Sequence, residues 1–514
     1  MQTLSGLAIE ALDRARISRD PRFDGKFFIA VTSTGVYCRP ICPSRHAKRT
    51  HVRFFVSPAA AEAAGFRPCL RCRPEAAPGT PAWLGTAAVV RRALRLINAG
   101  ALDEASVSAL ASRLGIGPRH LVRLFARHVG ASPIAVAQTR RLHFAACLLE
   151  QTNLPITQIA MAAGFGSSRR FNHAFRGTYR RTPRELRQGR RRAAAADSSA
   201  EVVLRLAYRP PYDWLHLREF LARRAVAGVE RVDARGYART VACEGGHAIV
   251  SVSALRGQDA LELRVAGAPP AALLQLSSVA RRVFDLTADP HRIGVALGTD
   301  PLIGPLVRQR PGLRIPGTWD PFECAVRAVL GQQVSVAAGR TFAARLVERA
   351  GTVIRGGIDG LTHLFPGAAA LATADLEGLG ITRSRVAALQ ALARAVLERR
   401  VDFGAAPGRL VQELAGLPGM GPWTAQYVAL RALGEPDALP TGDLVLRRMA
   451  APDGTVLSAR ELEARAREWQ PWRGYAVVHL WGAAAERAAL RIRAANRPLG
   501  ASASVTFSRA DVRR

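Results

Sequence analysis

Four cysteines lie close together near the start of the chain, in two short pairs. Three residues separate Cys38 from Cys42, and two separate Cys69 from Cys72. Two short cysteine pairs on separate turns are the arrangement of a tetrahedral zinc–thiolate site, which on its own is most often a structural staple. The chain has seven cysteines in all, and its start lacks the basic-then-apolar signature of a signal peptide. Reduced thiolates in a cytoplasmic protein are therefore expected rather than disulfides.

Two breaks rich in proline, glycine, alanine or arginine divide the 514 residues, at 78–81 and at 189–200. Strand-like and helical stretches alternate before the first break, helical patterns fill the region up to the second, and strands return after it before a last helical region. We therefore predict a multidomain α+β protein. Its expected parts are a small α/β zinc domain over 1–77, an all-helical domain over 82–188, a linker over 189–200, an α+β domain over 201–315, an all-helical domain over 316–490 and a flexible tail over 491–514.

The chain is strongly basic, with a formal net charge of +33 and a sequence pI near 11.5. Such a charge favours a polyanionic partner, most often nucleic acid. Lys26 and Lys48 are the only lysines, and all other basic residues are arginines. That skew also fits a high-GC genome, which is the alternative reading of the charge. No apolar run reaches the ~18 residues that a membrane-spanning helix needs.

The residues around the cysteines are more informative than their spacing. The segments TGVYCRPIC at 34–42 and GFRPCLRC at 65–72 closely resemble the N-terminal domain of the Ada family of bacterial alkylation-response proteins. The resemblance covers about residues 1–77. It implies one zinc ion held by the four cysteines and a cysteine, here Cys38, that accepts a methyl group from a methylated DNA phosphotriester. Zinc keeps sulfur as the thiolate, which is the nucleophilic form.

The same resemblance implies a DNA-contacting surface beside the cysteines. The family's DNA contacts fall on Thr34, Arg45 and Arg67, whereas a further family arginine falls on Pro43 here. Four thiolates around Zn2+ carry a net charge of about −2, and methylating one of them leaves about −1. Binding to phosphates is therefore expected to tighten after methyl transfer.

Two helix–turn–helix patterns follow, at 107–125 and at 156–175. The second of these includes a helix expected over 168–179, whose polar side chains Arg169, Arg170 and Asn172 could enter a major groove. A lone pattern of this kind can also be a plain helical hairpin. Two copies ending in Thr-Pro at 182–183 resemble the AraC-type double helix–turn–helix domain, which implies sequence-specific binding to promoter DNA.

Two motifs in the last third of the chain are weak when each is taken alone. The segment LPGMGPW at 417–423 fits a helix–hairpin–helix, in which Gly419 and Gly421 allow backbone N–H groups to approach a DNA phosphate. A simple helix connector is the alternative. Asp443 ends a loop rich in glycine and proline at the start of a helix, where an aspartate is most often only an N-cap.

Together with other segments, these motifs resemble the AlkA branch of helix–hairpin–helix DNA glycosylases over residues 201–490. The matching segments are PPYDW at 210–214, GLRIP at 312–316, VLGQQVS at 329–335, LPGMGPWTA at 417–425 and PWRGYAVVHLW at 471–481. The resemblance implies that Asp443 is the catalytic carboxylate and that Trp423, Tyr427 and Trp481 line the pocket for a flipped base. Each aromatic residue taken alone could equally be a core residue.

The implied chemistry is removal of an alkylated purine such as 3-methyladenine. Alkylation makes the base a cation, which stacks favourably on electron-rich rings, and Asp443 stabilises the sugar cation that forms when the base leaves. The family's DNA wedge, a leucine in its best-known member, falls on Gln333. No lysine follows Lys48, so no Schiff base is available and a glycosylase without lyase activity is expected. Only Cys243 and Cys324 follow residue 201, too few for a four-cysteine iron–sulfur cluster.

These features lead to a fused alkylation-response protein that combines a methyl sensor, a promoter-binding domain and a base-excision glycosylase. The alternative is a transcription regulator whose glycosylase half is a non-catalytic DNA clamp. Expected partners are double-stranded DNA and RNA polymerase, with no membrane. A monomer associated with the nucleoid is expected. Zinc is expected at the four cysteines, and a monovalent cation is expected at the hairpin. No other cofactor is expected for the glycosylase.

Overall fold

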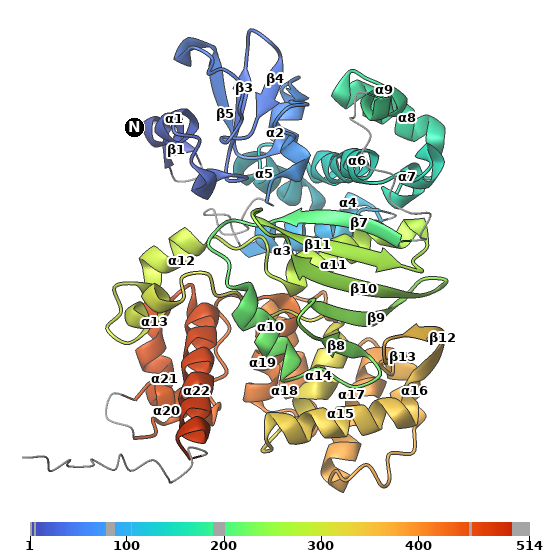
Figure 1. Ribbon diagram of the computed structural model, residues 1–514, viewed down its shortest axis with the longest axis vertical. Helices are drawn as coiled ribbons and strands as arrows, with labels where there is room; N and C mark the ends of the chain where they lie inside the picture. The colour runs from blue at the N-terminus through green and yellow to red at the C-terminus, as the bar shows by residue number, and fades with distance from the viewer. Residues whose placement is uncertain are drawn as a thin grey trace, which may run out of the picture.

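The computed structural model describes residues 3–4, 7–78, 88–103, 105–188, 201–451 and 455–495. The predicted linker at 189–200 and residues 496–514 of the predicted tail lie outside these ranges. In Figure 1 the N-terminal part and the following helices lie on one side of a central sheet, and the C-terminal helices lie on the other. The described chain is thus a multidomain α+β protein, as the sequence predicted.

The N-terminal part is a small sheet flanked by helices α1 (Ile9–Ile17) and α2 (Pro58–Ala63). Its strands occur in the order β5-β3-β4-β6, with β6 parallel to β4. Their bounds are Phe28–Val31 for β3, Val36–Cys38 for β4, Val52–Phe55 for β5 and Arg67–Pro68 for β6. The β4–β6 pairing brings the two cysteine segments together, because each pair lies at or just after the end of one of these two strands.

The next part is entirely helical among its described residues. Its helices are α3 (Ala88–Asn98), α4 (Val107–Leu114), α5 (Pro118–His128), α6 (Pro133–Gln151), α7 (Ile156–Ala162), α8 (Ser168–Tyr179) and α9 (Pro183–Gln188). Ser106 caps α4 by accepting a hydrogen bond from the amide of Ala109, and Gly115 ends it with φ 72°. Such a left-handed residue lets the chain reverse directly into α5, which starts at Pro118.

The sheet seen at the centre of Figure 1 has five antiparallel strands in the order β7-β11-β10-β9-β8. The strands are β7 (Glu201–Ala207), β8 (Glu230–Val232), β9 (Tyr237–Cys243), β10 (Gly246–Ala254) and β11 (Ala260–Ala266), with helices α10 (Trp214–Ala222) and α11 (Leu273–Val283) beside them. Alternate residues of β10 are buried, which is the period-two pattern of a strand with one covered face.

Most of the remaining chain is helical. The helices are α12 (Pro290–Leu297), α13 (Ile303–Gln309), α14 (Pro321–Leu330), α15 (Val336–Ala350), α16 (Ala368–Thr373), α17 (Arg383–Leu397), α18 (Pro407–Ala415), α19 (Pro422–Leu433), α20 (Leu444–Met449), α21 (Ala459–Arg465) and α22 (Arg473–Ala495). The prediction of a helical region over 316–490 holds with one addition, the hairpin of β12 (Thr352–Ile358) and β13 (Leu361–Leu364).

The packing of two helices crosses the predicted division between residues 315 and 316. Helices α12 and α13 precede residue 316, yet their apolar residues Ile293 and Ile303 share a core with Trp469 near the start of α22. This pair of helices therefore packs with the C-terminal helices rather than with the sheet, as Figure 1 also shows. Helix α22 ends at Ala495, so the predicted tail at 491–514 begins inside this helix.

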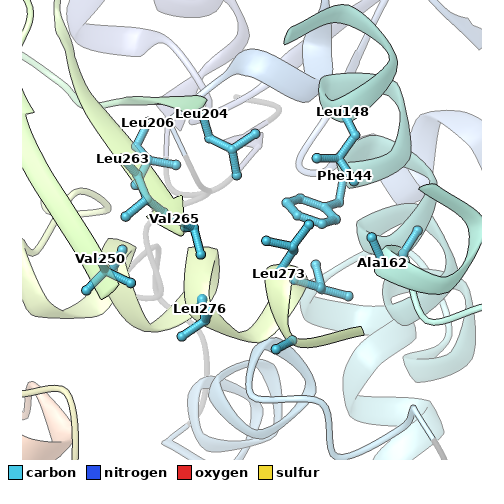
Figure 2. Close-up of a cluster of buried hydrophobic side chains, with 14 of the residues drawn as sticks. Phe144, Leu148, Ala162, Leu204, Leu206, Val250, Leu263, Val265, Leu273 and Leu276 are labelled. Atoms are coloured by element: carbon cyan, nitrogen blue, oxygen red, sulfur yellow. The ribbon is translucent and has the colours of Figure 1, made fainter. Parts of the chain in front are cut away.

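The helix–turn–helix part and the sheet share one apolar core. Figure 2 shows Phe144 and Leu148 of α6 facing Leu204 of β7, Val265 of β11 and Leu273 of α11 across it. All five side chains are at most 9% exposed. The two breaks in the sequence suggested independently folded modules, but burial of this continuous apolar surface couples the two parts.

A buried ion pair joins the N-terminal part to the sheet-containing half. The ammonium of Lys26 lies 2.6 Å from a carboxylate oxygen of Asp289, and the two side chains are 4% and 1% exposed. Arg209, 1% exposed, donates to the backbone oxygens of Asp24 and Pro78 on one side and of Thr287 on the other. A buried charge that loses its partner is costly, so this pair holds the two parts in one relative position.

Replacing Lys26 with methionine is expected to destabilise the folded chain by roughly 3–5 kcal/mol, because Asp289 is left buried without its partner. Denaturant unfolding, followed by tryptophan fluorescence, measures this loss. The double variant Lys26→Met with Asp289→Asn is expected to recover much of it, since both charges of the pair are gone and asparagine can still cap α12 at the amide of Arg292. If Lys26→Met alone were as stable as the parent, the pair would not hold the two parts together.

Candidate metal centre, DNA glycosylase site and nucleic-acid interface

The four cysteines converge as the spacing predicted. Their sulfur atoms all lie within 4.8 Å of one another. Cys42, Cys69 and Cys72 are each at most 9% exposed, whereas Cys38 at the end of β4 is half-buried. Four cysteine sulfurs at such separations match the donor set of a closed tetrahedral zinc site. Cys38 is the residue of the four with the largest exposed fraction.

Arg39 lies next to the cysteine cluster and forms hydrogen bonds to it. Sequence reasoning missed this role of Arg39. Its backbone amide donates to the sulfur of Cys72 at 3.3 Å, and its guanidinium donates to the carbonyl oxygen of the same residue at 3.2 Å. The carboxylate of Asp24 accepts from the guanidinium at 2.9 Å. Hydrogen bonds and positive charge beside the sulfur atoms stabilise thiolates and fix their orientation.

The three residues expected to contact DNA in this domain are close to the cysteines along the chain, and each is at least partly exposed. Thr34 is exposed in the turn before β4, and Arg45 is exposed shortly after Cys42. Arg67 is half-buried in β6, where it pairs with Val36 of β4. The strand pairing thus places Arg67 next to the strand that ends in Cys38.

The second helix–turn–helix presents the expected polar face. Phe171 and Phe175 are fully buried, while Arg169, Arg170 and Asn172 of α8 are exposed. The side chain of Ser167 caps α8 by accepting from the amide of Arg170 at 3.3 Å. The helix therefore has its aromatic residues in the core and an exposed face of polar and basic side chains.

Asp443 is the N-cap of α20, and its carboxylate also contacts an aromatic side chain. One carboxylate oxygen accepts from the amide of Leu446 at 2.9 Å and so caps α20. The other lies 3.4 Å from the indole nitrogen of Trp423, which donates to it. The carboxylate is therefore oriented at a helix start, while its second oxygen faces an aromatic side chain.

The three predicted pocket aromatics lie together beside this carboxylate. The rings of Trp423 and Tyr427, one turn apart on α19, are stacked with centroids 5.5 Å apart. The ring of Trp481 on α22 lies 6.0 Å from that of Tyr427. All three are partly exposed rather than sealed in the core. A row of half-buried rings next to a carboxylate suits a planar, cationic base better than it suits core packing.

The hairpin has the backbone geometry that its glycines predicted. Gly419 has φ 75°, and a Cβ there would lie 2.7 Å from the Cβ of Ala388, so only glycine fits without a shift. Gly421 is the N-cap of α19, and both glycines are exposed. The amides at the start of α19 are therefore available to a phosphate, and the helix dipole favours that negative charge.

Gln333 lies at the tip of a loop that is tied to this hairpin. The residue is exposed and has φ 53°, an uncommon conformation for a residue other than glycine. Its neighbour Gln332 donates to the carbonyl oxygen of Gly419 at 2.8 Å and to the hydroxyl of Thr424 at 2.9 Å. Sequence reasoning missed Gln332, because its role depends on a contact with a residue far along the chain.

Comparison with known proteins finds a family for each main part of this chain. Four family descriptions match: the metal binding domain of Ada at residues 11–75, a helix-turn-helix domain at 110–189, the AlkA N-terminal domain at 203–320 and the HhH-GPD superfamily of base excision DNA repair proteins at 326–473. The probable bifunctional transcriptional activator/DNA repair enzyme AlkA of Mycobacterium tuberculosis is 42% identical over 472 residues, covering 91% of this chain and 95% of that protein. The chain belongs to this AlkA family of bifunctional proteins.

The two halves of this bifunctional AlkA chain also match separate proteins of Escherichia coli. DNA-3-methyladenine glycosylase 2 is 37% identical over 286 residues, which are 54% of this chain and 95% of that protein. The bifunctional transcriptional activator/DNA repair enzyme Ada is 35% identical over 191 residues, which are 37% of this chain and 51% of that protein. Among the described residues of the chain, none of the helices combines the length and apolarity needed to cross a membrane.

Proposed function

We propose that this AlkA-family chain excises alkylated purines from DNA and also accepts methyl groups on Cys38 as a signal for transcription. The observation that carries the glycosylase assignment is the carboxylate of Asp443 beside the row of Trp423, Tyr427 and Trp481. The convergence of four cysteine sulfurs, with Cys38 the least buried residue of the four, supports the methyl-acceptor assignment.

In the proposed glycosylase reaction the damaged nucleotide leaves the duplex and its base stacks on the aromatic row. Extruding the base costs a few kcal/mol, which phosphate contacts at the hairpin around Gly419 and Gly421 help to offset. We propose that Gln333 fills the space left in the duplex. The bond between the sugar and the base breaks with both electrons going to the base. Asp443 stabilises the sugar cation until water adds and loses its proton.

In the proposed methyl transfer the sulfur of Cys38 attacks the methyl carbon of a methylphosphotriester. The carbon–oxygen bond breaks, and the phosphate leaves as an ordinary negatively charged diester. Cys38, Cys42, Cys69 and Cys72 would hold one Zn2+, whose contribution is to keep the sulfurs as thiolates near neutral pH. Thr34, Arg45 and Arg67 would hold the DNA backbone so that the methyl carbon can reach Cys38.

The readout of methyl transfer is proposed to be promoter binding through the two helix–turn–helix units. Arg169, Arg170 and Asn172 on the exposed face of α8 would contact the major groove. RNA polymerase is the proposed partner at the promoter, and the protein is proposed to act as a nucleoid-associated monomer in the cytoplasm. A monovalent cation is proposed at the hairpin, beside its phosphate-binding amides.

The proposed glycosylase is expected to release 3-methyladenine from methylated DNA and to leave abasic sites in intact strands. Borohydride is expected to trap no covalent complex on residues 201–514, because that half contains no lysine. Chromatography of released bases and peptide mapping of treated protein measure these two outcomes. An adduct at the N-terminal amine is compatible with the proposal, whereas one within 201–514 contradicts it. Absence of base release from freshly methylated DNA would favour the alternative of a non-catalytic DNA clamp.

A further inference from the structure

A buried arginine contacts Tyr427, the middle residue of the aromatic row, and its guanidinium lies 5.5 Å from the centroid of that ring. Arg431 follows Tyr427 by one turn of α19 and is 7% exposed. Its guanidinium donates to the hydroxyl of Tyr427 at 2.6 Å, and it also donates to the backbone oxygens of Pro316 and Gly317. All three acceptors are uncharged, so hydrogen bonds fix the guanidinium without neutralising its charge.

A second arginine reaches the same place from the sheet-containing domain. The guanidinium of Arg224 lies 3.7 Å from the ring centroid of Phe220, and that of Arg431 lies 4.8 Å from the same centroid. Burial lowers the pKa of Arg224 to about 10, so the group remains charged at neutral pH. Neither arginine forms an ion pair with any carboxylate in the described part of the chain. Two uncompensated positive charges therefore lie behind the aromatic row.

This charge affects the bound substrate and the reaction in opposite directions. A base alkylated at N3 or N7 carries a positive charge, which nearby guanidinium groups repel. When the sugar–base bond breaks, both bonding electrons go to the base, which leaves as a neutral molecule, and the positive charge passes to the sugar beside Asp443. The charge on the base thus falls by one unit. A positive potential behind the base therefore favours the transition state over the bound substrate.

The hydroxyl of Tyr427 connects this charge to the pocket. Guanidinium groups have donors only, so the hydroxyl accepts from Arg431 and its own proton is not used in that bond. The ring of Tyr427 forms the middle of the aromatic row, between Trp423 and Trp481. Arg431 therefore fixes the ring and places a positive charge behind it, without contacting the base itself.

We propose that Arg431, acting through Tyr427 and supported by Arg224, promotes departure of the base while weakening the binding of cationic bases. This proposal rests on the proposed function, because it takes the aromatic row to be the base pocket. It makes Arg431 a positioning residue that sets the balance between cationic and neutral purines. Aromatic rings alone would favour the cation, and the arginines oppose part of that preference.

The test compares Arg431→Met, which removes the charge, with Arg431→Lys, which keeps it. Single-turnover base release is measured on a duplex with one 7-methylguanine, and the enzyme concentration giving half of the maximal rate reports binding. We expect Arg431→Met to lower the rate roughly tenfold, less than the ~100-fold typical of a donor that touches the reacting atoms. The same variant should bind the 7-methylguanine duplex more tightly. Arg431→Lys should retain most of the parent rate.

A duplex with one hypoxanthine, a neutral purine, is the binding control. Affinity is measured relative to the matched undamaged duplex, and Arg431→Met should not tighten it. Arg224→Met provides a second variant if Arg431→Met does not fold. Arg223→Met is its matched control, because Arg223 is the exposed neighbour and, within the described part of the chain, its guanidinium donates to the backbone oxygen of Glu219 alone. Arg224→Met should also lower the rate of base release and tighten the binding of the 7-methylguanine duplex. Arg223→Met should match the parent in both properties.

Two results overturn the proposal while leaving the proposed function intact. One is an unchanged rate in both Arg431→Met and Arg224→Met. The other is a loss of base-release rate in Arg431→Met together with weaker binding of both duplexes, with Arg431→Lys performing no better. A residue with a purely structural role would behave in this way. A parent protein that releases no base overturns the proposed function, and with it this inference.

Discussion

Asp443→Asn is expected to lose roughly 10²–10⁴-fold in the rate of base release while still binding DNA. The carboxylate supplies the negative charge that stabilises the sugar cation, and asparagine lacks that charge. Asparagine is as good an N-cap as aspartate, so the hydrogen bond to the amide of Leu446 and the start of α20 should persist. The expected loss therefore reflects chemistry rather than folding. Single-turnover release of 3-methyladenine and a gel-shift assay measure the two properties.

A matched control for this variant is Asp320→Asn. Asp320 also caps a helix, accepting from the amide of Glu323 at 3.0 Å, but it belongs to α14 rather than to the aromatic row. The control should keep the parent rate. If Asp443→Asn released bases at the parent rate, Asp443 would have no part in the mechanism, and the carboxylate would be an N-cap alone.

Methylphosphotriester DNA is expected to methylate Cys38 irreversibly, and Cys38→Ala is expected to abolish this uptake. Zinc should be retained after methylation, because a thioether can remain a weak ligand. Removing one negative charge beside the DNA phosphates should raise affinity several-fold, since a pair of surface charges is worth about 1 kcal/mol at close range. The gain should shrink as salt is added. Mass spectrometry locates the methyl group, and DNA binding at several salt concentrations measures the gain.

Cys243→Ala is the control for methyl uptake, since Cys243 lies in β9, outside the cysteine cluster. The Cys38→Ala variant should keep its glycosylase activity, because the contacts that join the two halves involve Lys26 and Arg209 rather than Cys38. A methyl group found on Cys69 instead of Cys38 would show that the acceptor is wrongly assigned. No methyl transfer at all would exclude the sensor function.

The sequence by itself was sufficient for features that depend on short stretches of chain. The spacing of the four cysteines predicted a cluster, and the structure confirms it. Each pair lies on one turn at the end of a strand, so the spacing within a pair is set locally. The helix–turn–helix units were readable from the short patterns at 107–125 and 156–175, because helix caps and turns act on their immediate neighbours. The position of Asp443 at a helix start was readable in the same way.

Only the tertiary structure decided which distant residues meet. Arg431 looks like an ordinary charged residue of a surface helix in the sequence, yet it is buried against carbonyl oxygens of Pro316 and Gly317. Gln332 binds the hairpin at Gly419, and Lys26 pairs with Asp289 across two domains. The periodicity of a helix or strand records which face is buried, but it does not record what covers that face. The neighbours come from packing, which here brings together residues that are 87 to 263 positions apart in the sequence.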